Sequence, residues 1–282
     1  EGCNQVAHVN RYRLMQAVTG SVVVWSCLLG GANLWTAVAA VLVQLTWECI
    51  LIFSRYGPLC RQLFRTTPGA FQWRREIWPL QWKIGLQSAA KYLAIFPLIP
   101  TIFAWQSPAA AGRVGITWQV LNSLLLVAYA WIRTRAPEFG TLIAQGKTDE
   151  SNRAFFKATF GSTAMLIAAV SSFWLVLAIL QTHDWGLATK VATRFLAAGT
   201  TIWFALAMIP LHITQCFSIH IRSRKIDPIW RVSILGNVVL APSLFLAASQ
   251  ASVATVGIVM LVIFTAVMVS VVAIWRHCNR SE

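Results

Sequence analysis

The strongest constraint in this sequence is the length of its uncharged runs. Residues 14–47 and 232–275 contain no Asp, Glu, Lys or Arg, and each run is long enough to cross a membrane twice, since a spanning helix needs about 20 residues. Only 11% of the 282 residues are charged and 57% are hydrophobic, whereas soluble domains carry about 25% charged residues. The sequence therefore predicts an all-α membrane protein with several transmembrane helices.

Two polar clusters that contain helix breakers or small residues divide the long runs. The first run divides at GGAN (30–33) and the second at SQAS (249–252). With the four shorter runs between them, these divisions give eight transmembrane helices. The predicted spans are 14–29, 34–53, 80–105, 114–131, 160–180, 195–211, 232–247 and 253–275.

The basic residues test this division, because cytoplasmic loops carry the Lys and Arg excess of a membrane protein. With eight spans, nineteen of the 23 Lys and Arg residues fall on one side and three on the other, and Lys91 remains within a span. The sequence thus predicts that both ends of the chain are cytoplasmic. The net charge of +14 is then explained by loops beside the lipid bilayer, and no nucleic-acid partner is predicted.

Lys91 is the most informative single residue. It lies in QWKIGLQSAAKYLAIFP (81–97), about 16 Å into its span at 1.5 Å per residue, and a charge at that depth costs at least ~2.5–3.5 kcal/mol. Lys83, Gln87 and Lys91 recur every fourth residue and share one helix face. Pro97 and Pro100 predict a kink beyond them. We interpret Lys91 as facing a polar cavity; the alternatives are a structural tie to one carboxylate, or a shifted span that brings Lys91 to an interface.

Other polar residues in the spans extend this candidate substrate cavity. Gln119, Asn122 and Tyr129 form a second stripe, with Arg113 at its outer mouth, and Asn237 lies in the seventh span. Bonding between helices is the alternative role for such residues. The complete set of candidate cavity residues is Lys91, Gln87, Lys83, Arg113, Gln119, Asn122 and Asn237.

Acidic residues are scarce in the predicted spans. Glu48 is the only one, and it is the candidate for ion coupling; the alternative is a position close to the membrane surface, where it would meet Arg55 or water. A lumen with cationic side chains favours an anionic ligand such as a phosphate or an acidic sugar.

The sequence carries no signature of enzyme chemistry, so the chain is not expected to be an enzyme. It lacks HExxH, GxSxG, P-loop and paired-acid motifs. The six cysteines are scattered without a CxxC pair, and neither a metal nor a cofactor is predicted. His212 and His220 are expected at the basic cytoplasmic edge.

Two segments resemble a known transporter superfamily. APEFGTLIAQGKTDESNRAFFKATF (136–160) and REIWPLQWKIGL (75–86) are similar to segments of polysaccharide flippases in the multidrug/oligosaccharidyl-lipid/polysaccharide exporter superfamily. That resemblance implies two six-helix lobes. Residues 1–54 would be the last two helices of a truncated first lobe, 55–79 a basic cytoplasmic inter-lobe loop, 80–276 the complete second lobe, and 277–282 a cytoplasmic tail. About four upstream spans would be missing from this chain.

The resemblance also implies a function. Members of the superfamily move lipid-linked oligosaccharides across the bacterial inner membrane for O-antigen, capsule or exopolysaccharide synthesis. The implied substrate is a polyprenyl-pyrophosphate-linked glycan, and a polysaccharide polymerase or assembly proteins are the implied partners. Lys91 and Arg113 would contact phosphate or acidic sugar.

Three alternatives stay open. A drug/cation antiporter of the same superfamily should place carboxylates in its lumen. A membrane-embedded glycosyl- or acyltransferase of the same pathway should show a carboxylate or histidine pair at a cavity mouth. An inactive, truncated assembly partner is the third.

Overall fold

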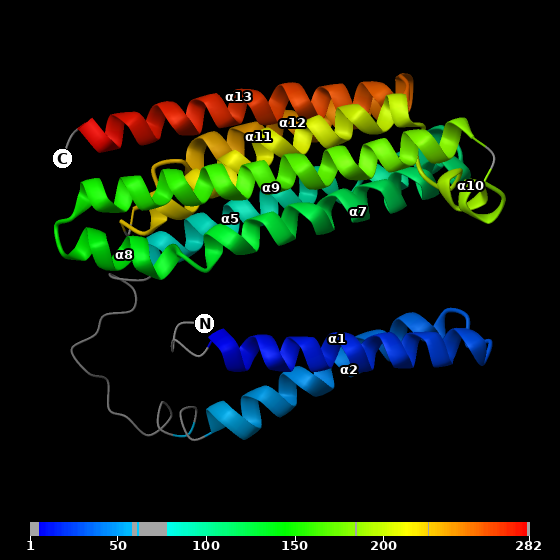
Figure 1. Cartoon of the computed structure of the whole chain (residues 1–282), viewed down its shortest axis with the longest axis horizontal. Helices are drawn as coiled ribbons and strands as arrows, with labels where there is room; N and C mark the ends of the chain where they lie inside the picture. The colour runs from blue at the N-terminus through cyan, green and yellow to red at the C-terminus, as the bar shows by residue number, and fades with distance from the viewer. Residues whose placement is uncertain (1–5, 58–60, 62–77, 184, 225, 281–282) are drawn as a thin grey trace. The chain divides into compact units, whose positions relative to one another are not determined.

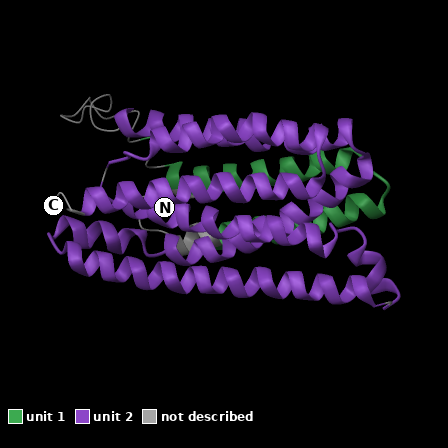
Figure 2. Ribbon diagram, turned by 90° about the horizontal axis from the view of Figure 1, so that it is seen from above, with its two compact units in different colours: residues 1–72 green, residues 73–282 purple. Residues whose placement is uncertain are grey.

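The computed structural model describes residues 6–57, 61, 78–183, 185–224 and 226–280, which are drawn as coloured ribbon in Figure 1. Within these residues the chain forms helices joined by turns, without a strand. The chain divides into two compact units, residues 1–72 and 73–282, coloured separately in Figure 2.

Seven helical segments of the described chain are long and apolar enough to cross a membrane, which supports the prediction of an all-α membrane protein. The first predicted span, 14–29, is not among them, although it lies within the 24-residue helix α1 (Val6–Leu29). The count of eight spans therefore stays a prediction. The seven segments are Trp35–Ser54, Trp78–Trp105, Pro108–Ala144, Thr148–Thr182, Ala198–Arg222, Trp230–Gln250 and Val253–Asn279.

The first unit is a hairpin of α1 and α2 (Trp35–Leu51), and α2 continues into a short π-helix at Ile52–Tyr56. The turn between the helices falls at the predicted GGAN cluster, where Gly31 and Asn33 have φ angles of 71° and 46°. Across the hairpin, Trp47 Nε1 donates a 2.7 Å hydrogen bond to Thr19 Oγ1. Most of the predicted inter-lobe loop, 55–79, lies outside the described residues.

The second unit holds the remaining six apolar segments. Its described helices are α5 (Trp78–Ile95), α6 (Leu98–Trp105), α7 (Pro108–Arg133), α8 (Ala136–Ala144), α9 (Thr148–Thr182), α10 (Leu187–Ala192), α11 (Ala198–Arg222), α12 (Trp230–Gln250) and α13 (Val253–Arg280).

Several helices extend beyond the predicted spans. α9 begins twelve residues before predicted position 160, at Thr148, and carries Asp149 and Glu150 in its first turn, where acidic side chains interact favourably with the helix dipole. α13 continues through most of the predicted tail to Arg280. The predicted boundaries were too short because they used charged residues to mark the ends of helices, and these helices continue past such residues.

The turn between α8 and α9 explains part of the segment on which the resemblance rests. Gly146 has φ of 75°. Its amide donates to the carbonyl of Ile143, and the amide of Lys147 donates to that of Leu142. These two bonds form a Schellman C-cap, in which glycine is favoured because the backbone is left-handed. The step LIAQGK is therefore a helix stop followed by a new helix.

The predicted kink is a break between α5 and α6. Pro97 lacks an amide hydrogen, so the hydrogen-bond ladder of α5 cannot continue through it. α6 restarts with a bond from the Thr101 amide to the Pro97 carbonyl, 2.9 Å long. After the break, α6 packs against both α7 and α12, whereas α5 packs mainly against α12. α5 and α7 consequently leave space between them.

Two glycines allow close packing around α13. A Cβ added at Gly236 on α12 would lie 2.5 Å from Val267 Cγ2, and one at Gly257 on α13 would lie 2.8 Å from Trp203 Cβ on α11. Both distances are far below van der Waals contact. At these two points a side chain of one helix therefore lies directly against the backbone of its neighbour, with no room for a Cβ.

The structure places the rings of two predicted edge histidines inside the bundle. His212 and His220 are fully buried, and His220 lies in the basic last turn of α11 beside Arg222. His220 packs among the rings of Phe139, Phe155 and Trp275 and stacks on Phe155, with ring centroids 4.4 Å apart. His212 Nε2 lies 2.9 Å from Ser162 Oγ on α9 and 3.4 Å from Cys216 Sγ. Both rings therefore connect helices within the bundle.

Candidate functional site

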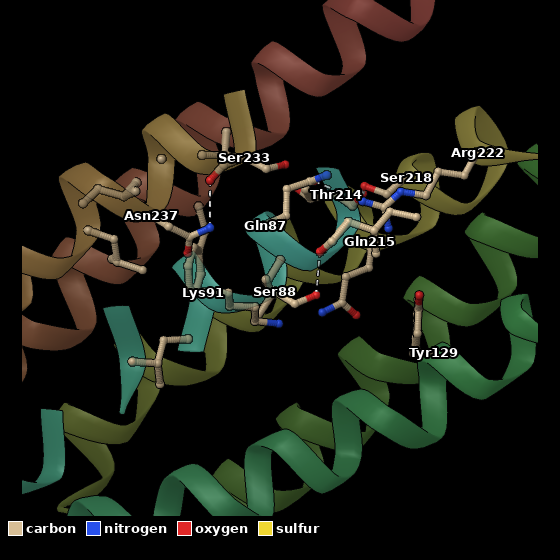
Figure 3. A pocket seen from close by; sticks show the side chains of 18 residues that line it. Gln87, Ser88, Lys91, Tyr129, Thr214, Gln215, Ser218, Arg222, Ser233 and Asn237 are labelled. Carbon is tan, nitrogen blue, oxygen red and sulfur yellow. Dashed lines mark hydrogen bonds between the residues drawn. The ribbon is translucent and has the colours of Figure 1, made fainter. Parts of the chain in front are cut away.

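The second unit contains a partly open cavity of about 190 Å³ between α5, α7, α11, α12 and α13, lined by both polar and apolar side chains. Figure 3 shows its polar side chains gathered around this space. The break after α5 helps to form it, because α6 closes against α7 whereas α5 does not. Its polar lining residues are Gln87, Ser88, Lys91, Tyr129, Thr214, Gln215, Ser218, Arg222, Ser233 and Asn237.

Lys91 lies at the rim of the cavity. Its side chain and that of Ser88 are exposed, whereas Gln87 and Leu240 are buried, so α5 forms the mouth of the cavity. Lys91 makes no hydrogen bond or ion pair with any described residue. An ammonium group carries three donors and no acceptor. Within the described chain, all three donors of Lys91 therefore remain available to a ligand or water.

Arg222 lies at the end of the cavity that the sequence predicts to face the cytoplasm. Its Nε donates to Asp227 Oδ2 at 3.2 Å, and its Nη2 donates to Gln87 Oε1 at 3.0 Å. Gln87 Nε2 also donates to Asp227 Oδ2, at 2.8 Å. The three side chains thus form a closed triangle that joins α5, the end of α11 and the α11–α12 loop.

The remaining polar residues are of two kinds. Thr214 and Ser218 donate to carbonyl groups one turn earlier in α11, at 2.8 and 2.7 Å, and present only acceptors to the cavity. Tyr129 and Gln215 make no hydrogen bond with any described residue. Together with Lys91, these two side chains supply free donors, the kind of group that binds an anionic oxygen.

The structure brings three of the predicted residues together and leaves the others apart. Lys91, Gln87 and Asn237 line the cavity, and Asn237 Nδ2 donates to the Ser233 carbonyl at 2.7 Å. The predicted residues that are absent from its lining are Lys83, Arg113, Gln119 and Asn122.

These outlying residues have other surroundings. Lys83 lies 5.8 Å from the centroid of the Trp230 ring, as a cation–π contact. Arg113 and Gln119 are exposed on α7. Glu48 belongs to the first unit, where it is exposed and accepts a 3.1 Å hydrogen bond from Gln44.

The sequence interpretation missed Arg222 and Asp227 as site residues. Arg222 was counted among loop charges and Asp227 was not considered, yet its side chain is fully buried. Their spacing in the sequence could have indicated this ion pair. Arg222 and Asp227 are five residues apart across a helix end, where a cation and a carboxylate can form a salt bridge.

No protein-family model, curated protein or solved structure matches this chain.

Proposed function

We propose that this chain is part of a transporter that moves a polyprenyl-pyrophosphate-linked glycan across the bacterial inner membrane, with both ends of the chain in the cytoplasm. In this proposal the second unit is one lobe of a two-lobe flippase, and its cavity receives the anionic head group. The observation that carries the proposal is Lys91, a cation within an apolar segment that lines a cavity without an acidic partner among the described residues.

The chemistry of the lining supports an anionic ligand. Lys91, Tyr129 and Gln215 offer donors without described partners, and Arg222 adds a second cation. Diphosphate oxygens accept charge-assisted hydrogen bonds from such groups. In the described chain no carboxylate lines the cavity directly, which disfavours the alternative of a drug/cation antiporter.

The position of the cavity supports a ligand attached to a lipid. α5 forms its mouth, and the outward side chains of this helix include the exposed apolar residues Leu86, Tyr92 and Leu93. A polar head group could enter between α5 and α7 while its prenyl chain stays in the bilayer. This arrangement agrees with transport, and the described residues that line the cavity include no carboxylate or histidine pair of the kind expected for a glycosyl- or acyltransferase.

The test is direct binding of a polyprenyl-pyrophosphate oligosaccharide to the purified chain in lipid nanodiscs. Lys91→Ala is expected to weaken binding about tenfold or more, because a hydrogen bond to a charged group contributes about 1.5–3 kcal/mol. Lys91→Arg should retain most of the affinity. Lys190→Ala, which removes an exposed lysine on α10 outside the cavity, is the matched control.

Two results would contradict the proposal. One is wild-type affinity in Lys91→Ala. The other is equal binding of a neutral polyprenol-linked glycan, which would show that the anionic group is not recognised.

A further inference from the structure

Arg222 lies between the cavity and a buried carboxylate. One side of this residue lines the cavity, and its Nε donates to Asp227 Oδ2. The side chain of Asp227 is fully buried, whereas that of Arg222 is 32% exposed. The arginine is therefore the only member of this ion pair in contact with the cavity.

Asp227 binds Arg222 through only one of its two carboxylate oxygens. Within the part of the chain that the structure describes, Asp227 accepts hydrogen bonds through Oδ2 alone, from Arg222 and Gln87. Its second oxygen, Oδ1, is buried and has no partner among the described residues. A guanidinium and a carboxylate bind most strongly through two parallel hydrogen bonds. A diphosphate that enters the cavity could offer Arg222 more acceptors than Asp227 does.

We infer that Asp227 is the ion-pair partner of Arg222 until a ligand binds. The anionic group of the ligand then replaces Asp227 as the partner of Arg222. This inference rests on the proposed function, because it requires an anion in the cavity. Asp227 would then act as an internal competitor that sets how tightly an anion binds.

Replacement of Asp227 by an anion at Arg222 would also affect Gln87. Its amide donates to Asp227 while its carbonyl accepts from Arg222, so one side chain of α5 depends on both members of the ion pair. When an anion takes Arg222, the triangle loses the bond that closes it. The bond that ties the end of α11 to the α11–α12 loop is then lost, and Gln87 alone still holds Asp227 among the described residues, so anion binding is expected to loosen this loop.

The first experiment measures pyrophosphate binding to the purified chain in detergent micelles by isothermal titration calorimetry. Asp227→Asn is expected to bind pyrophosphate about tenfold more tightly than wild type, because the competing charge is lost. Glu138→Gln is the matched control: it removes a carboxylate from an exposed ion pair with Arg135, 3.2 Å long, and should leave the affinity unchanged. In an Arg222→Gln background, Asp227→Asn should give no gain.

A second measurement on the wild-type protein covers the case in which Asp227→Asn does not fold. Hydrogen–deuterium exchange of residues 226–230 should become faster when pyrophosphate is added, since the loop loses its bond to Arg222. Exchange on α10 serves as the internal reference and should not change.

The outcomes separate the two proposals. If wild type binds pyrophosphate but Asp227→Asn binds no more tightly, and exchange of residues 226–230 does not accelerate, the internal-competitor inference is wrong and the anion cavity stands. If neither wild type nor Asp227→Asn binds pyrophosphate, both proposals fail.

Discussion

Trp275 donates a 3.0 Å hydrogen bond from its indole Nε1 to Nδ1 of His220, and thereby joins α13 to α11 beside the buried rings of Phe155 and Phe217. Because an indole nitrogen only donates, Nδ1 of His220 is an acceptor and the ring is neutral. The opposite ring nitrogen, Nε2, then carries the hydrogen and donates to Ser151 Oγ, 3.3 Å away. This buried imidazole therefore has a structural role and connects three helices.

Loss of the indole donor should destabilise the bundle. Trp275→Phe leaves His220 Nδ1 buried without a partner, which costs about 1–3 kcal/mol. We expect a lower melting temperature in detergent. Trp131→Phe is the control, because Trp131 is 52% exposed; an equal loss of stability in both variants would contradict the role of the hydrogen bond.

Close packing of α13 on α11 predicts intolerance of a methyl group at Gly257. In Gly257→Ala the new Cβ would lie 2.8 Å from Trp203 Cβ, and such overpacking costs about 1–3 kcal/mol. Gly112→Ala on α7 meets no atom within 4 Å and should be neutral or slightly stabilising. Thermal unfolding of the two variants gives the comparison; similar melting temperatures would show that α11 and α13 can separate freely.

The helix stop before α9 depends on one left-handed residue. Gly146→Ala places a side chain at φ of 75°, which costs about 1–2 kcal/mol. Gly140→Ala, in the preceding helix and without a neighbour within 4 Å, should not destabilise. Limited proteolysis between α8 and α9 should be faster in Gly146→Ala alone; unchanged cleavage would contradict a required turn.

The predicted orientation can be tested with single cysteines in a variant that lacks the six native ones. Lys190→Cys on α10 should react with a membrane-impermeant thiol reagent added outside the cytoplasm, and Lys147→Cys should react only after the membrane is opened. Both positions are exposed. The reverse labelling pattern would contradict the orientation predicted from the distribution of Lys and Arg residues.

Sequence patterns were sufficient where a local property determines the structure. The breaks at 30–33 and 249–252 and the interruption at Pro97 follow from turn formers and a missing amide hydrogen. Lys91 was found because a charge within an apolar run has few stable surroundings.

Other features depend on contacts between distant residues. The ion pair of Arg222 with Asp227 includes Gln87, which is 135 residues before Arg222, so the chain order of these residues does not reveal the triangle. The absence of Lys83 from the cavity reflects the nearby Trp230 ring on α12. The need for glycine at 236 and 257 arises only once the distance between helices is known.

The close packing at Gly236 also affects which of the helices around the cavity can move outward. Gly236 and Val267 both line the cavity, on helices that meet with no room for a methyl group. At this point the α12 backbone lies against the Val267 side chain of α13, whereas on α5 Lys91 is unbonded within the described chain and Gln87 is held by exchangeable polar bonds. A guest too large for the present volume is therefore expected to displace α5 before it separates α12 from α13.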